Sequence, residues 1–308
     1  MAENTSQSNH VLLAFDGSEH AQAAVDMLLD IPLARCEAPG EVTQVTVLAV
    51  MPTQYISGHE QLQTSLDRAC DKLRQGGLKA AGILRAGNPP VTINSMAQEL
   101  DARLLMIGAR GLRATLGILL GGVAQTVVEY AHCPVLVVRA PYRGLSQALL
   151  TIDGSVYGQK ALEYVAPGPA GNACPVLPGH SAVHVMHVLP PIMPPEAGLR
   201  AWPIGPEVIY PAPLMAGQDW EKLEEEERQH GRELLENAAA ALKLEGIPTT
   251  SSLREGDAST EILDYANKNP VDLVICGSRG WSEVTGWFMG SVSRKLVHYA
   301  PCSVLVVK

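Results

Sequence analysis

The segment VLLAFDGSEHAQAAVDMLL (residues 11–29) determines the fold, because a segment of the same pattern, ALLTIDGSVYGQKALEYVA, returns at residues 148–166. Each segment begins with an apolar run, turns at Asp-Gly-Ser and continues with apolar residues at helical spacing. Asp, Gly and Ser are common in turns, and Ser is a preferred residue at a helix N-terminus. Each segment therefore predicts a buried strand followed directly by a helix.

Three more pairs of similar segments follow in the same order. The pairs are VTVLAVMP (45–52) with VHVMHVLP (183–190), RAGNPPVTINSMAQELDARLLMIGARG (85–111) with REGDASTEILDYANKNPVDLVICGSRG (254–280), and AHCPVLVV (131–138) with APCSVLVV (300–307). Alternation of apolar runs with helical patterns is typical of parallel strands joined by helical crossovers, with both faces of the sheet covered. We therefore expect an α/β fold with two tandem doubly wound parallel-sheet domains, at residues 1–143 and 144–308.

The second copy carries an additional segment at about residues 190–220, PPIMPPEAGLRAWPIGPEVIYPAPLMAGQDW. Its proline content excludes a regular helix or strand. We expect a long surface loop. The alternative is a lid or partner-contact segment, which would give Trp202, Ile209 and Tyr210 a surface to cover. The following residues, 220–246, predict a long helix whose acidic run forms a solvated face.

Composition excludes several classes of function. A net charge of −9 argues against a generic nucleic-acid binder, and 5% aromatic content argues against a stacking surface for single strands. No apolar run approaches the ~20 residues of a membrane span, and residues 1–10 lack the features of a signal peptide. The six cysteines show no CxxC spacing, as in proteins of a reducing compartment. We expect a cytoplasmic protein with neither nucleic-acid nor membrane partners.

Three histidines, at positions 180, 184 and 187, raise the question of a metal site. On a strand, His184 and His187 point to opposite faces of the sheet, so one ion cannot use both. We expect no metal site built from these side chains.

The spacing G-x2-G-x9-G-S, formed by Gly277, Gly280, Gly290 and Ser291, follows an apolar run of the second copy. In an open parallel sheet, ligands bind beyond the carboxyl ends of the strands. Glycine allows a ligand close to the backbone, and free amides at a helix start near Ser291 favour an anion. The alternative is that the glycines serve only the packing of strand against helix. Neither the GxxxxGK[ST] nor the GxGxxG fingerprint of nucleotide sites is present.

Together with the Asp that closes the first strand and the terminal VLVV run, this spacing resembles the universal stress protein family, as a tandem UspA-like member. The resemblance implies a flavodoxin-like or Rossmann-like fold of the adenine nucleotide alpha hydrolase type. It also implies binding of ATP, or of ADP or AMP, with Mg as a possible companion, and a role in the stress response. No catalytic residue is implied.

The resemblance assigns positions in the second copy to parts of the nucleotide. Asp153 is placed near the ribose or a phosphate-bound metal, although it could serve only as a turn former and helix cap. The remaining implied contacts are His187 and Val188 with adenine, Gly277, Ser278, Arg279 and Gly280 with ribose and α-phosphate, and Gly290, Ser291, Val292 and Ser293 with the outer phosphates.

The first copy departs from this pattern at two positions. Gly122 stands in the place of Ser291 and Ala124 in the place of Ser293, so two hydroxyl donors are missing. We expect a weaker or purely structural site there. Its implied residues are Asp16, Val50, Gly108, Arg110, Gly111, Gly121 and Gly122.

The terminal apolar strands, at 134–138 and 303–307, predict how the halves associate. In the family such strands pair across a twofold interface, so we expect them to pair within this chain as a pseudo-dimer, since an open apolar edge invites aggregation. A homodimer of the whole chain and unidentified protein partners are further expectations.

Two alternative functions remain open at this point. The first is slow ATP hydrolysis, for which Asp153 is the clear candidate base in a chain without a Walker-type lysine. The second is a scaffold without nucleotide, or a binder of another small ligand.

Overall fold

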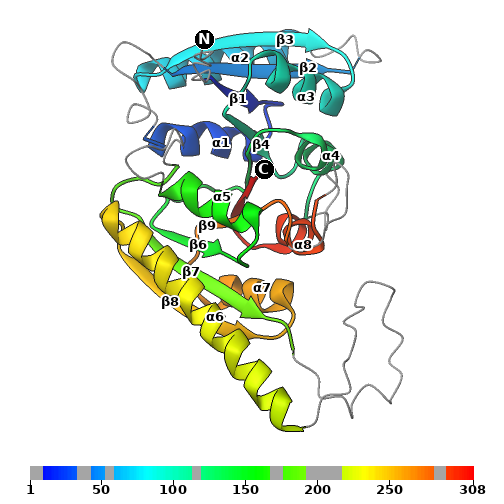
Figure 1. Ribbon diagram of the computed structural model, residues 1–308. Helices are drawn as coiled ribbons and strands as arrows, with labels where there is room; N and C mark the ends of the chain where they lie inside the picture. The colour runs from blue at the N-terminus through cyan, green and yellow to red at the C-terminus, as the bar shows by residue number, and fades with distance from the viewer. Residues whose placement is uncertain are drawn as a thin grey trace, which may run out of the picture.

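The computed structural model describes residues 10–32, 43–52, 59–112, 119–166, 176–191, 217–280 and 289–308 (Figure 1). Strands and helices alternate in both halves, as the apolar and helical patterns predict. The first half contains β1 (His10–Ala14), α1 (Glu19–Asp30), β2 (Gln44–Met51), α2 (His59–Gln75), β3 (Lys79–Ala86), α3 (Pro89–Glu99), β4 (Leu104–Gly108), α4 (Gly122–Tyr130) and β5 (Val135–Val138). The second half contains β6 (Gln147–Thr151), α5 (Val156–Val165), β7 (Ala182–Leu189), α6 (Gly217–Leu244), β8 (Thr249–Glu255), α7 (Ala258–Lys268), β9 (Leu273–Gly277), α8 (Ser291–Tyr299) and β10 (Ser303–Val307).

All ten strands form one sheet in the order β3-β2-β1-β4-β5-β10-β9-β6-β7-β8. Within each half every pairing is parallel, with β1 between β2 and β4 and β6 between β7 and β9. The α/β class and the two doubly wound halves are therefore confirmed. Figure 1 shows β3 and β8 at the two outer ends of the sheet, with α6 lying along β7 and β8.

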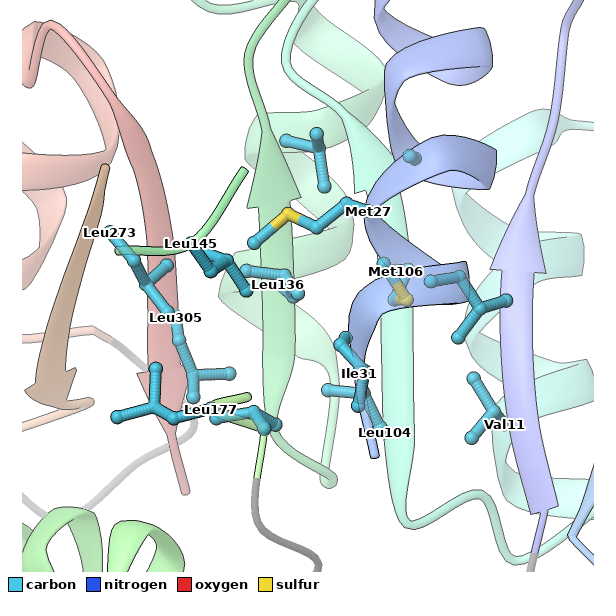
Figure 2. Packing of buried hydrophobic residues seen from close by; sticks show 14 of the residues in the cluster. Val11, Met27, Ile31, Leu104, Met106, Leu136, Leu145, Leu177, Leu273 and Leu305 are labelled. Carbon is cyan, nitrogen blue, oxygen red and sulfur yellow. The ribbon is translucent and has the colours of Figure 1, made fainter. Parts of the chain in front are cut away.

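The core forms two layers, one on each face of the sheet, because successive strand residues point to opposite faces. Val11 and Leu13 belong to the layer that α1, α2, α5 and α6 cover, whereas Leu12 and Ala14 belong to the layer under α3, α4, α7 and α8. Figure 2 shows the first layer continuing from Met106 and Leu136 to Leu305 without interruption. Both layers thus extend through both halves.

The two halves meet through β5 and β10, which pair antiparallel in the centre of the sheet. Leu136 lies opposite Leu305, and both side chains are fully buried. The last apolar strand of each half is therefore paired with that of the other half, and the two edge strands of the sheet are β3 and β8. Of these, β8 reads TTSSLRE and is largely polar. Polar edge strands resist the strand addition that leads to aggregation.

A cation follows each central strand and reaches the other half. Arg139, after β5, donates from Nη2 to the carbonyls of Val297 (2.9 Å) and His298 (3.0 Å) at the end of α8. Lys308, after β10, donates from Nζ to the carbonyl of Val128 (2.6 Å) near the end of α4. A hydrogen-bond donor at a helix C-terminus satisfies carbonyls that have no partner within the helix. Each half therefore caps a helix of the other.

The additional segment of the second copy lies mainly outside the described residues. Residues 192–216, with Trp202, Ile209 and Tyr210, are not described, so the choice between surface loop and lid stays a prediction. The long helix after the segment is confirmed, as α6. No described helix combines the length and apolarity that crossing a bilayer requires.

Lys308 generates a prediction about pH. Burial lowers the pKa of Lys308 to about 8 from its ordinary 10.5. Between pH 8 and 10.5 the unfolded chain holds a proton that the folded chain has released, so stability rises with pH there. At 1.36 kcal/mol per pKa unit, the rise is on the order of 3 kcal/mol relative to a chain without this group. In Lys308→Met, the free energy of unfolding measured by chemical denaturation from pH 8 to 10.5 should not show this rise.

A second variant separates the titration of the side chain from its hydrogen bonding. Lys308→Arg keeps a donor for the Val128 carbonyl but does not titrate in this range, so it too should lack the rise. If the unfolding free energies of the parent and both variants run parallel from pH 8 to 10.5, the assignment to Lys308 is wrong.

Candidate functional site

A cavity of about 270 Å³ opens at the carboxyl ends of the strands in the second half. It lies beside β6, where the strand order turns back, with β9 on one side and β7 on the other. Such a reversal is the usual place for a ligand in an open parallel sheet. The cavity is lined by Thr151, Ile152, Asp153, Gly158, Met186, Val188, Ala258, Ile262, Cys276, Gly277, Arg279, Gly280, Gly290, Ser291, Val292 and Ser293.

The polar end of the cavity is the start of α8. The N-cap residue is Gly290, and no described side chain caps the helix. By contrast, α5 is capped by Ser155 and α7 by Asp257. Among the described residues no side chain therefore satisfies the first-turn amides of α8, and the positive end of the helix dipole faces the same space. This geometry suits an anion.

The loop before α8 is held by its own backbone and by one hydroxyl. The amide of Gly290 donates to the Ser278 carbonyl (2.8 Å), and Ser293 Oγ donates to that carbonyl at the same distance. Ser293 therefore uses its proton to fix the loop, which differs from the predicted contact with outer phosphates. Ser278 is buried and lies behind the loop, not among the cavity-lining residues. Ser291 lines the cavity and is exposed.

Asp153 forms the turn before α5, whereas Ser155, not Asp153, is the helix cap. Asp153 Oδ1 accepts from the backbone amide (3.0 Å) and the hydroxyl (2.6 Å) of Ser155, which stabilises the turn into α5. The carboxylate also lines the cavity. A Cβ added at Gly280 would lie 2.7 Å from Asp153 Oδ2, so only glycine lets the loop pass this close. The close approach of Gly280 to Asp153 therefore sets the separation of the two sides of the cavity mouth.

The first glycine of the spacing has a packing role. A Cβ on Gly277 would lie 2.6 Å from the carbonyl carbon of Tyr157, and one on Gly108 would lie 2.9 Å from the amide nitrogen of Ala21. The start of α5 or α1 thus crosses directly over the strand end in each half. Both glycines therefore serve the packing of strand against helix, and Gly277 also lines the cavity.

The opposite wall is apolar. Met186 and Val188 reach it from β7, and Ala258 and Ile262 reach it from α7. The sequence prediction included Val188 but missed Met186, although the period of two along a strand places both on one face. His187 was predicted beside them and lies on the other face: its Nδ1 is 2.8 Å from the Ile152 carbonyl, and its ring packs against Gly231 of α6. The alternation of the strand is the physical reason.

The other strand histidine lies on the cavity side of the sheet but does not line the cavity. His184 contacts the hydroxyls of Thr250 and Ser252 (2.8 Å each) and stacks on Tyr265 of α7. The predicted separation of His184 and His187 onto opposite faces is thus confirmed. Within the described ranges, no group of three His, Cys, Asp or Glu side chains is arranged to hold a metal ion.

The first half repeats the backbone of this site. The amide of Gly121 donates to the Ala109 carbonyl (2.7 Å), and α4 also begins without a side-chain cap from the described residues. Asp16 Oδ2 accepts from the Leu112 amide (3.2 Å), and a Cβ on Gly111 would lie 2.5 Å from the same oxygen. Val50 is the penultimate residue of β2, as Val188 is of β7. Among the described residues, nothing lies within 4 Å of a Cβ added at Gly122.

The two halves differ in how the loop arginine is held. Arg110 donates from Nε to His20 Nε2 (2.9 Å), whereas the Arg279 guanidinium lies over the Tyr157 ring at 5.7 Å. Burial, and then the charge of Arg110, lower the pKa of His20, so the imidazole stays neutral and can accept the bond. The arginine of the first half is therefore bound to a side chain, while that of the second half lines the cavity.

The close contact at Gly277 predicts a loss of stability on substitution. Gly277→Ala should lower the free energy of unfolding by about 1–3 kcal/mol, because the Tyr157 backbone must move away from the new methyl group. Gly122→Ala is the matched control, and its effect should stay within about 0.5 kcal/mol because its surroundings are open. Urea denaturation measures both, and equal effects would show that the strand–helix contact is not the cause.

Comparisons with known proteins agree with this architecture. A model of the universal stress protein family matches residues 8–139 and again residues 146–308. Universal stress protein YxiE of Bacillus subtilis is 26% identical over 169 residues, which cover 53% of this chain and 99% of the relative. A second relative is the universal stress protein in QAH/OAS sulfhydrylase 3′ region of Thermus aquaticus. It is 34% identical over 140 residues, which cover 42% of this chain and 97% of the relative.

The fold is shared over the whole length with a solved structure. A universal stress protein from Archaeoglobus fulgidus superposes with a TM-score of 0.63 at 21% identity, covering 98% of this chain and 99% of the other. The match extends over both halves, and the family model describes each half separately. The chain therefore belongs to the universal stress protein family and carries two of its domains in tandem.

Proposed function

We propose that this chain binds ATP, or a related adenine nucleotide such as ADP or AMP, in the cavity of its second half. We further propose that the bound nucleotide stabilises one conformation and so controls association with protein partners in the cytoplasm during stress. The observation that carries the proposal is the pairing of an apolar wall with an uncapped helix start in one cavity. An aromatic base suits the wall, and a phosphate suits the free amides.

The two ends of the cavity would receive different parts of the ligand. Met186, Val188 and Ile262 offer an apolar surface to the base, and Asp153 accepts hydrogen bonds from ribose hydroxyls. The amides that begin α8, with the Ser291 hydroxyl, donate to phosphate oxygens. Among the described lining residues Asp153 is the one carboxylate, so a magnesium ion would be held chiefly by phosphate and water oxygens and would neutralise phosphate charge.

The lining residues support binding over catalysis. Arg279 is the one cation among the described lining residues, which include neither a lysine nor a histidine, and burial raises the pKa of the Cys276 thiol to about 12, which disfavours the nucleophilic thiolate. Asp153 is already engaged by Ser155. Fast phosphoryl transfer needs a clamp of cations on the transferred group. Slow hydrolysis is the second candidate, because Asp153 could still orient a water.

The first half is proposed as the weaker site. It keeps the backbone but has Gly122 and Ala124 in place of two hydroxyls, and its Arg110 is held by His20. A cytoplasmic location is proposed because the described cysteines are free, with Cys70, Cys133 and Cys276 buried as thiols.

Ligand identification and titration test the proposal. Mass spectrometry of material released from the purified full chain should detect an adenine nucleotide, and calorimetry should give saturable ATP binding. Ser291→Ala removes one donor to a charged oxygen and should weaken ATP binding by about tenfold. Gly122→Ala is the control at the equivalent position of the first half and should leave the tighter binding step unchanged.

The alternatives give different results in the same preparation. Phosphate release that Asp153→Ala abolishes, with folding verified by thermal unfolding, would establish slow hydrolysis. Absence of both co-purified nucleotide and a titration signal would refute nucleotide binding and favour a scaffold role.

A further inference from the structure

Lys295 lies one helical turn beyond the candidate phosphate site. It follows the cavity-lining Ser291 by four residues on α8, so both side chains lie on the same face of the helix. Side chains on a helix tilt toward its N-terminus, and one turn rises about 5.4 Å, a length that an extended lysine can span. Helix geometry therefore allows the ammonium group of Lys295 to reach the first-turn amides of α8.

The structure places this ammonium group beside the cavity wall. Lys295 Nζ donates to Ser259 Oγ (3.0 Å) and lies 3.8 Å from Asp257 Oδ1. Ser259 and Asp257 stand on either side of Ala258, which lines the cavity. The lysine thus bridges the starts of α8 and α7 next to the polar end of the cavity.

The present contacts of Lys295 are weak enough to be exchanged. The side chains of Lys295 and Asp257 are 51% and 55% exposed, and ion pairs of this kind contribute little to stability. Asp257 does not depend on the lysine, because its Oδ1 also accepts from Ser259 Oγ (2.5 Å), the Thr260 amide (2.9 Å) and Thr260 Oγ1 (2.7 Å). The ammonium group can therefore turn toward a ligand without leaving a buried charge unpaired.

The first half has no counterpart to this cation. Thr126 stands in the place of Lys295 and Asn88 in the place of Asp257. Thr126 Oγ1 donates to the Gly122 carbonyl of its own helix (2.9 Å), and Asn88 caps α3. The charged pair thus occurs in the half that also has the serine at the start of its last helix.

We propose that Lys295 determines ligand specificity in the second half by favouring polyphosphates over monophosphates. This inference rests on the proposed nucleotide site. The amides at the start of α8 hold the phosphate nearest the helix, and Lys295 supplies a mobile positive charge for the phosphates beyond it. A monophosphate has no group at that position and gains nothing from the lysine. A charge-assisted hydrogen bond is stronger than a neutral one, and its strength falls with salt.

Calorimetric titration of the full chain with ATP and with AMP, in buffer with a chelator, tests the inference. Lys295→Thr reproduces the residue of the first half and should reduce the preference for ATP over AMP by about tenfold, with AMP affinity changed less than twofold. Lys295→Arg keeps the charge and should retain most of the preference. In Lys295→Thr, ATP affinity should also depend less steeply on salt.

The outcomes distinguish this inference from the function on which it rests. If the parent chain binds neither nucleotide, the nucleotide site itself is refuted. If the parent binds both and Lys295→Thr leaves their ratio and its salt dependence unchanged, the role of Lys295 is refuted while the site stands. Thr126→Lys, at the same helical position of the first half, is the control and should not alter the tighter binding step.

Discussion

The antiparallel pairing of β5 with β10 is the interaction on which the rest of the molecule depends. Each half alone would end in a short apolar strand with a free hydrogen-bonding edge. Pairing buries both strands and makes the two core layers continuous. It also brings Arg139 and Lys308 to the last turns of α8 and α4.

Much of this architecture could be predicted from sequence, since it depends on patterns that repeat. The apolar runs at 11–15 and 148–152, each followed by Asp-Gly-Ser, predict strand, turn and capped helix, and Ser18 and Ser155 do cap α1 and α5. The start of α8 at Ser291 was also predictable from the glycine before it. The reciprocal contacts of Arg139 and Lys308 were not, because a lone cation after a strand does not indicate which helix end lies opposite.

The site was predictable in outline and less so in detail. Spacing brought Asp153, Gly280 and Gly290 to one cavity, as expected. The spacing could not predict that the Ser293 hydroxyl donates to the Ser278 carbonyl, because this contact depends on the three-dimensional path of the backbone. The misplacement of His187 has a simpler cause: in a strand, neighbours in sequence face opposite sides, so His187 and Val188 cannot share one cavity. Met186 and Ile262 are ordinary apolar residues that belong to no binding motif. Only the structure shows that they line the cavity.

Arg139 makes one more contact, and it links distant parts of the molecule. Besides holding the end of α8, its Nη1 donates to the carbonyl of Leu119, two residues before Gly121 (2.7 Å). One guanidinium thus contacts both the residues just before Gly121 in the first half and the C-terminal end of α8. The N-terminal end of the same helix opens onto the cavity of the second half. Replacement of this one side chain would therefore remove contacts in both halves at once, at Leu119 and at the end of α8.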